Sequence, residues 1–141
     1  NNKLSQIPDA IAQLSRLQTL DLSYNQLNQI PDAVGELSQL QTFYLVDNRL
    51  SQIPDTIGKL SQLQTLDLGS NRFGQIPDII SKLNNLEVLD LQDNHIDRLP
   101  ASISQLKQIR RICLFGNPLQ SLPQALKHLE KAVLFKGTFC Y

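Results

Sequence analysis

The chain has 141 residues, and its 13 Lys and Arg residues balance its 13 Asp and Glu residues, so the formal net charge is zero. A neutral chain lacks the basic surface with which proteins track nucleic acid or anionic membranes. No apolar stretch approaches the ~20 residues of a membrane-spanning helix. The two cysteines are too few for a disulfide framework or a four-ligand zinc site. We therefore expect a soluble protein that needs no cofactor and binds neither nucleic acid nor membrane.

A unit of 23 residues recurs along the whole chain without insertions. Asparagine marks one position of the unit, at Asn2, Asn25, Asn48, Asn71, Asn94 and Asn117. Such a period indicates one supersecondary unit that stacks on its neighbours. We expect about six units in a single domain, 1–141, with a partial first unit and a degenerate last unit over 132–141. The domain is expected to be a segment of a larger protein.

Each unit is predicted to contain one short strand. In the sequence from Thr65 to Leu68 polar and apolar residues alternate, so the leucines point into the core while Thr65 and Asp67 face solvent. The repeat predicts strands near 19–22, 42–45, 65–68, 88–91 and 111–114, and a degenerate one near 133–136. Parallel strands ~4.8 Å apart would form a sheet about 24 Å wide.

A short helical segment is predicted after each strand. Pro54 suits the first helical position, where its missing N–H is not needed, and Asp55 follows it near the positive end of the helix dipole. Ile57 and Leu60 lie three residues apart and turn toward the strands. The units would stack into a right-handed solenoid of the α/β class, with a parallel sheet on its concave side and helical segments on its convex side.

The motifs of the unit resemble those of a known family. Residues 63–73, LQTLDLGSNRF, match the pattern L-x-x-L-x-L-x-x-N-x-L with one Phe, and residues 53–60, IPDTIGKL, are similar to L-P-x-x-I-x-x-L. The chain thus resembles the leucine-rich repeat family, in the 23-residue subclass of intracellular signalling and bacterial proteins. It is similar to the repeats of Ras-scaffold and Roco-type proteins. The resemblance implies a module for protein recognition.

The recurring asparagines are expected to be structural. An inward Asn at a turn bonds backbone groups of its own and the adjacent unit, which avoids a cost of ~1–3 kcal/mol for unpaired buried groups. The predicted ladder comprises Asn25, Asn48, Asn71, Asn94 and Asn117.

Catalytic groups have no suitable arrangement in this pattern. Cys113 is predicted at a surface strand position and His95 in the turn after the preceding strand, which separates them by ~15 Å. A nucleophile and its base need a distance of ~3 Å. The sequence has no glycine-rich phosphate loop, metal-spaced cluster or nucleophile elbow. We expect no enzymatic activity, no catalytic residue and no metal or cofactor.

Residues that vary between units and face the concave side are candidates for binding. Charged, aromatic and apolar side chains are mixed there, as in recognition surfaces. The predicted binding residues are Tyr44, Asp67, Asp90, Asp93, Arg72 and Phe115. Tyr44 and Phe115 would be apolar anchors. Asp67 and Asp90, about 5 Å apart, would favour a basic protein or peptide because their charges repel each other.

Two other interpretations remain open. The chain could be a regulatory or autoinhibitory segment of a larger signalling enzyme, such as a Roco-type GTPase or a bacterial ubiquitin ligase, whose catalytic domain lies elsewhere. It could also be a structural repeat that self-associates through uncapped ends, since repeat arrays need polar cover at their ends. The few cysteines and the absence of N-glycosylation sequons indicate the cytoplasm.

Overall fold

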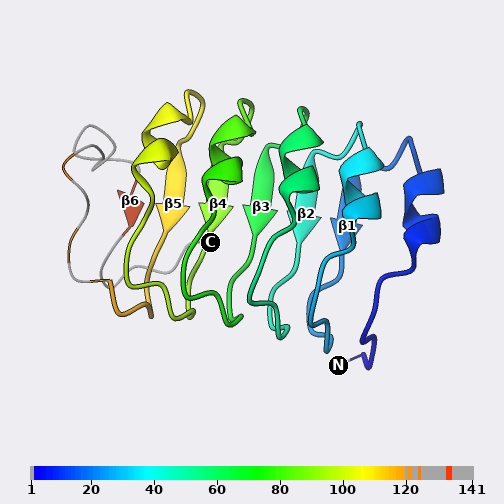
Figure 1. Ribbon diagram of the computed structural model, residues 1–141, viewed down its shortest axis with the longest axis horizontal. Coiled ribbons are helices and arrows are strands. Elements are labelled where there is room, and N and C mark those ends of the chain that lie inside the picture. The colour runs from blue at the N-terminus through cyan, green and yellow to red at the C-terminus, as the bar shows by residue number, and fades with distance from the viewer. Residues whose placement is uncertain (1, 120, 122–123, 125–132, 135–141) are drawn as a thin grey trace.

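The computed structural model describes residues 2–119, 121, 124 and 133–134, which form one six-stranded parallel sheet and five short 3₁₀ helices. The strands stand side by side in chain order (Figure 1). They are β1 Thr19–Asp21, β2 Thr42–Tyr44, β3 Thr65–Asp67, β4 Val88–Asp90, β5 Arg111–Cys113 and β6 Val133–Leu134. The helices form a second row along the sheet (Figure 1). They are η1 Asp9–Gln13, η2 Asp32–Glu36, η3 Asp55–Lys59, η4 Asp78–Lys82 and η5 Ala101–Gln105.

This arrangement confirms the predicted solenoid of the α/β class and the positions of its strands. Each of the first five strands has three residues, one fewer than predicted, and neighbouring strands pair in the register of the repeat, as in Phe43 opposite Leu66. The sixth predicted strand is present as Val133–Leu134. The other residues of the predicted degenerate unit, 132 and 135–141, lie outside the described part of the chain.

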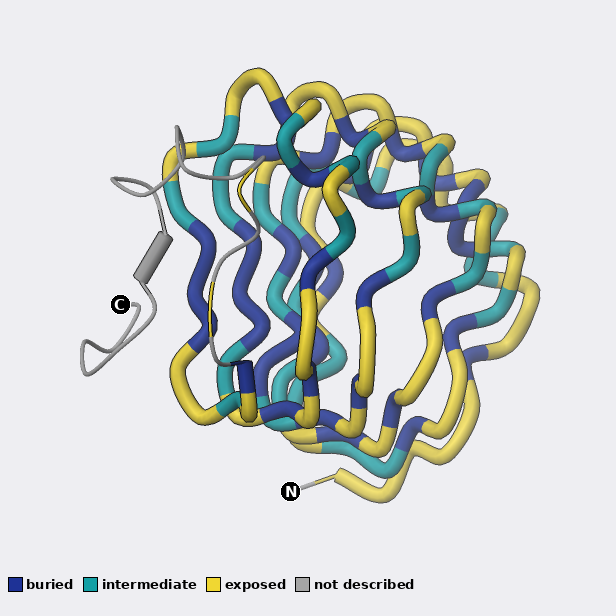
Figure 2. Tube along the Cα trace, turned by 60° about the vertical axis from the view of Figure 1, so that its left-hand side comes forward, coloured by how far each residue is buried: buried dark blue, intermediate teal, exposed yellow. Residues whose placement is uncertain are grey.

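The core lies between the row of strands and the row of helices. Leu66 and Leu68 come from one strand segment, and Ile57 and Leu60 come from the helical segment that precedes it in the chain; all are 1% exposed or less. Buried positions recur at corresponding places of successive coils (Figure 2). Because each unit supplies only one layer of side chains, its core is closed by its neighbours.

Each helix begins one residue later than the sequence predicts. Pro54 is not the first helical residue but precedes η3 in an extended conformation, with φ of −69° and ψ of 149°. Its carbonyl accepts a hydrogen bond from Ile57 N–H at 3.0 Å, and the Ile57 carbonyl accepts one from Leu60 N–H at 3.0 Å. The proline therefore caps the helix through its C=O, while Asp55 occupies the first turn.

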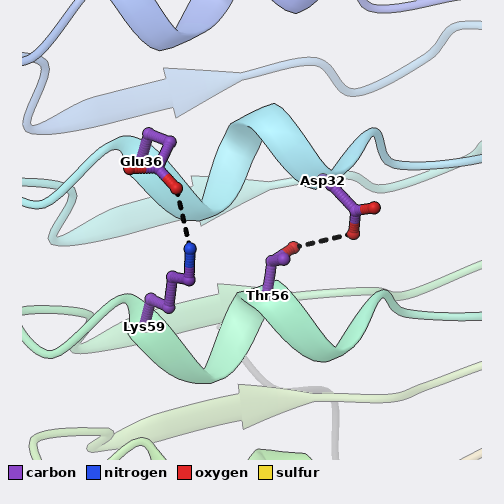
Figure 3. Close-up of polar contacts among 4 residues, drawn as sticks. All are labelled: Asp32, Glu36, Thr56 and Lys59. Carbon is purple, nitrogen blue, oxygen red and sulfur yellow. Dashed lines mark hydrogen bonds and ion pairs between the residues drawn. The ribbon is translucent and has the colours of Figure 1, made fainter.

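Polar contacts join neighbouring helices on the solvent side of η2 and η3. Lys59 Nζ lies 2.8 Å from Glu36 Oε1, and Thr56 Oγ1 donates to Asp32 Oδ1 at 3.2 Å (Figure 3). The hydrogen bond to Glu36 raises the pKa of Lys59. Because both side chains of the ion pair are more than half exposed, the pair adds little stability. It does leave these two charges neutralised on the helix side.

One residue of each turn adopts a left-handed backbone conformation. These residues immediately precede the ladder asparagines, and they are Tyr24, Asp47, Ser70 and Asp93, with φ of 50–59°, and Gly116, with φ of 73°. Such a conformation costs non-glycine residues free energy. Each of these residues is followed directly by an asparagine that is buried or half-buried.

Candidate protein-recognition face

The solvent side of strands β2 to β5, which we call the sheet face, holds three of the predicted binding residues in one row. Tyr44 of β2 is paired in register with Asp67 of β3, and Asp67 is paired with Asp90 of β4. Tyr44 and Asp67 are half-buried, whereas Asp90 is buried, at 7% exposure. The parallel register thus brings an aromatic ring and two carboxylates onto neighbouring strands.

The two carboxylates also bond the turns that follow their strands. Asp67 Oδ1 accepts a hydrogen bond from Gly69 N–H at 3.0 Å. Asp90 Oδ1 accepts one from Gln92 N–H at 2.9 Å, and Asp90 Oδ2 accepts one from the Gln92 side-chain amide at 2.8 Å. The contact with Gln92 was not predicted from the sequence. It satisfies both oxygens of Asp90, which is consistent with the burial of this residue.

Gly69 lies between these carboxylates and carries no side chain to separate them. A Cβ atom added at Gly69 would lie 3.2 Å from Asp67 Oδ1 and 3.7 Å from Asp90 Oδ1. The corresponding positions in neighbouring units carry Val46 and Gln92. The sequence signal for this convergence was a glycine at a repeat position where the two neighbouring units carry larger residues. The sequence-based interpretation missed this signal.

Both carboxyl groups have raised pKa values. Burial is the largest cause of the shift that raises the pKa of Asp67 to about 6; the Gly69 hydrogen bond opposes it, and the charges of Asp90 and Asp21 add to it. Burial also raises the pKa of Asp90, against its hydrogen bonds to Gln92. The row is therefore an anionic site whose charge is costly in the absence of a cation.

The remaining predicted residues lie near the ends of the strands. Asp93 is exposed, its N–H donates to the Phe115 carbonyl at 2.8 Å, and its charge contributes to raising the pKa of Asp90. Phe115 follows β5 and is 37% exposed. Asp93 therefore borders the carboxylate row, and Phe115 contacts Asp93 through its backbone carbonyl.

Arg72 is separate from this row. It is exposed in the turn after β3 and lines an open groove of about 660 Å³ with Gln52, Gln75 and Asp78, between the turns and the helices. A similar groove of about 520 Å³ lies one unit earlier. Of the six predicted binding residues, Arg72 is the one that lines the 660 Å³ groove.

Cys113 is not at a solvent-exposed strand position, contrary to the sequence-based prediction. Its side chain is 1% exposed, and the residue is disulfide-bonded. A sulfur atom in a disulfide bond is covered by its partner and does not present a thiol to solvent. Cys140, the other cysteine of the sequence, lies outside the described residues.

The ladder asparagines bond backbone groups of two adjacent units. Asn71 Oδ1 accepts from Leu50 N–H of the preceding unit at 3.0 Å. Its Nδ2 donates to the Leu45 carbonyl of that unit at 2.9 Å and to the carbonyls of Leu68 and Gly69 at 3.1 and 3.0 Å. Equivalent contacts with the preceding unit are made by Asn48, Asn94 and Asn117. Asn25 accepts from Leu4 N–H at 3.1 Å.

The described part of the chain has neither a metal-ligand cluster nor a membrane-spanning helix. Within it, no three or more His, Cys, Asp or Glu side chains are placed to hold a metal ion. No helix there is long and apolar enough to cross a membrane.

The chain is similar in fold and in sequence to proteins of known structure. A leucine-rich repeat protein of Leptospira interrogans superposes with a TM-score of 0.88 and is 33% identical, with coverage of 95% of this chain and 35% of that protein. The plant peptide hormone receptor RGFR1, in complex with RGF2, gives a TM-score of 0.79 and 33% identity, with coverage of 96% and 27%.

A third similar structure is the ectodomain of an Arabidopsis thaliana receptor kinase, GASSHO1/SCHENGEN3, in complex with CASPARIAN STRIP INTEGRITY FACTOR 2. It has a TM-score of 0.79 and 33% identity, with coverage of 93% of this chain and 16% of the ectodomain. The chain thus spans between 16% and 35% of the length of these three proteins.

Sequence comparison agrees with the structural similarity. No curated protein matches the chain. The family model described as "Leucine-rich repeat region" matches residues 1–71 and 54–135, which together cover most of the sequence. The chain belongs to the leucine-rich repeat family.

Proposed function

We propose that this chain is a non-catalytic module that binds a protein or peptide on its sheet face, the concave side of the solenoid. The observation that carries this proposal is the row formed by Tyr44, Asp67 and Asp90 on three neighbouring strands. An aromatic side chain beside placed charges is typical of recognition surfaces. Two similar structures are receptors in complex with named ligands, which supports a partner of the same general kind.

Charge favours a basic partner. The carboxylates of Asp67 and Asp90 are partly or largely removed from water, and burial raises the pKa of each. A cationic side chain placed between them would compensate for this cost. Asp93 adds a third negative charge at the border of the row, and Phe115 adds apolar surface.

The test is selection of binding peptides from a random display library. The selected peptides are then measured against wild type and against the double variant Tyr44→Ala/Asp67→Arg, which leaves the buried Asp90 in place. The charge swap Glu36→Lys/Lys59→Glu is the matched control, because it changes the helix side and preserves its ion pair. We expect binding to be lost only in the sheet-face variant. Peptides that bind the double variant as tightly as wild type would contradict the proposal.

The regulatory and self-associating roles remain predictions, as does the similarity to Ras-scaffold and Roco-type repeats. Self-association predicts a mass that rises with protein concentration in sedimentation or light scattering. A cytoplasmic location also remains a prediction. Localising the protein in cells and measuring its free thiols would decide this point.

A further inference from the structure

The groove that Arg72 lines lies where the sequence departs from its own repeat. Residue 74 is glycine, whereas the corresponding positions of the two neighbouring units carry Ser51 and Asp97. A Cβ atom at Gly74 would meet no atom within 4 Å, so the missing side chain leaves open space beside the groove. The groove has a volume of about 660 Å³, compared with about 520 Å³ for the groove one unit earlier. The glycine therefore lies at the larger of the two grooves.

A second departure from the repeat concerns the charge beside Arg72. Two residues before Arg72 the chain carries Ser70, where the turns of the neighbouring units carry Asp47 and Asp93. Among the described residues, no carboxylate lies within ion-pair distance of the Arg72 guanidinium. The backbone N–H of Arg72 donates to the Leu50 carbonyl at 2.8 Å, and its side chain is exposed. The residue is thus fixed by its backbone at the groove, and its positive charge is open to a ligand.

Uncharged polar groups and apolar surface line the same groove. Gln52 and Gln75 come from two adjacent coils, and both are exposed. Ile53 and Ile76 also line the groove and are buried. A cleft with apolar lining and a few placed polar groups is typical of a binding site. The amide side chains can both donate to and accept from a peptide backbone.

One carboxylate of the groove limits the kind of anion that fits. Asp78, the first residue of η4, is among the lining residues, and its Oδ1 accepts a hydrogen bond from Ser102 Oγ. A ligand with several negative charges would be repelled by Asp78, whereas a single carboxylate beside Arg72 would be attracted. The lining is therefore complementary to one acidic side chain in an otherwise uncharged segment.

The length of the groove fits a short extended segment. Its lining residues come from three successive coils, at 51–53, 72–78 and Pro100. Because neighbouring strands lie ~4.8 Å apart, the outer two of three coils are separated by about 10 Å, which an extended chain spans in about three residues. The smaller groove shares Ser51, Gln52 and Ile53 with the larger one, so a longer segment can continue across it.

We propose that this groove binds an extended segment of a partner protein through one acidic side chain, whose carboxylate pairs with the Arg72 guanidinium. The guanidinium would donate two parallel hydrogen bonds to the carboxylate, which is the strong geometry for this pair. Gln52 and Gln75 would bond the backbone of the segment, and a neighbouring side chain would occupy the space beside Gly74. This surface is separate from the sheet face and does not depend on the proposed function.

Selection from a displayed library of random heptapeptides tests the groove. Peptides are selected on the wild-type chain and depleted on the variant Gly74→Leu, which places a side chain in the open space. We expect the remaining peptides to share an Asp or Glu at one position. Replacing that residue by Asn or Gln should weaken binding at least about fivefold in calorimetry. If no peptide remains, or if the remaining peptides share no acidic residue, the inference is wrong.

Two arginine variants of matched position identify the cation. Arg72→Gln should weaken binding of the selected peptides at least about fivefold and bring the acidic and amide peptides within about twofold of each other. Arg49→Gln is the control, because Arg49 holds the equivalent position of the preceding turn and is not among the residues that line the groove. It should retain both the affinity and the preference. Equal effects of the two substitutions would overturn the pairing with Arg72.

The groove and the sheet face can be tested independently. Groove peptides should bind the sheet-face variant Tyr44→Ala/Asp67→Arg as tightly as wild type, so they are set aside before the sheet face is tested. The sheet face is then judged on the peptides that still bind Gly74→Leu. Groove peptides that fail on the sheet-face variant would overturn the assignment to the groove. Circular dichroism and thermal melting establish that each variant is folded.

Discussion

Each ladder asparagine stabilises the contact between two stacked units. Asn71 is 6% exposed, and its side chain makes four hydrogen bonds to backbone groups of its own and the preceding unit. Each buried backbone group that loses its partner costs free energy. The asparagine therefore links local turn geometry to the packing of one unit on the next.

Replacing Asn71 by Ala should lower the free energy of unfolding by about 3 kcal/mol, since it leaves several buried backbone groups unpaired. Gln64→Ala is the control, because the Gln64 side chain is exposed and the change should cost less than about 0.5 kcal/mol. Denaturant unfolding of both variants measures the difference. Equal midpoints would show that the ladder bonds do not contribute to stability.

Asp67 is a residue whose ionisation opposes folding. Its folded-state pKa is raised from 3.8 to about 6, chiefly by burial. The folded state therefore binds a proton more tightly than the unfolded state between these values, so this group stabilises the fold as the pH falls through 6 toward 3.8. Above pH 6 its charge is a cost.

Asp67→Asn should consequently be more stable than wild type near pH 7.5, by about 1 kcal/mol after allowance for solvent screening at this partly exposed site. The advantage should shrink steadily as the pH is lowered to about 4, because wild-type Asp67 then becomes neutral as well. Thermal melting across this range measures the effect. Asp97→Asn is the control, since Asp97 and its partner Arg98 are exposed, and a pH-dependent gain of the same size there would refute the assignment to Asp67.

At the scale of the elements, the helices pack closely where small residues meet backbone. A Cβ atom at Gly35 of η2 would lie 2.6 Å from the Thr56 carbonyl oxygen and 2.7 Å from Thr56 Cβ of η3. Real Cβ atoms do not approach backbone so closely, so a side chain here would push the two helices apart. Gly74 differs, because a Cβ there would meet no atom within 4 Å.

Gly35→Ala should therefore destabilise the protein by ~1–3 kcal/mol through overpacking between η2 and η3. Gly74→Ala should change stability by less than ~1 kcal/mol. Chemical denaturation of the two variants compares the same substitution at a crowded and an open position. A larger loss at Gly74 would contradict the contact between the helices.

The whole molecule is held together by contacts between adjacent units. Every strand from β1 to β6 pairs with its sequence neighbour, and the ladder asparagines bond the preceding unit. Stability in such an array is approximately a sum over units and their interfaces. An array shortened by one complete unit therefore keeps the register of all the remaining contacts.

Deletion of residues 42–64, which is 23 residues, joins Gln41 to Thr65 and restores the junction of a normal unit. The product should fold with a lower midpoint, because one interface is lost. Deletion of residues 43–64, one residue fewer, adds a second threonine to the strand and shifts its alternation between core and solvent. This variant should lose its cooperative transition in thermal melts; equal melting of the two deletions would refute stacking in register.

The repeat in the sequence determined the α/β solenoid and the strand positions, because inward leucines and turn asparagines recur with a strict period that only stacked units satisfy. Tertiary structure alone decided the burial of Asp90, since it depends on the Gln92 amide and on strands at both sides. It likewise decided the burial of Cys113, the convergence of two carboxylates over Gly69, and the position of Arg72 along a groove. These features depend on distances between side chains of different units. Periodicity specifies only which side chains lie on the same face.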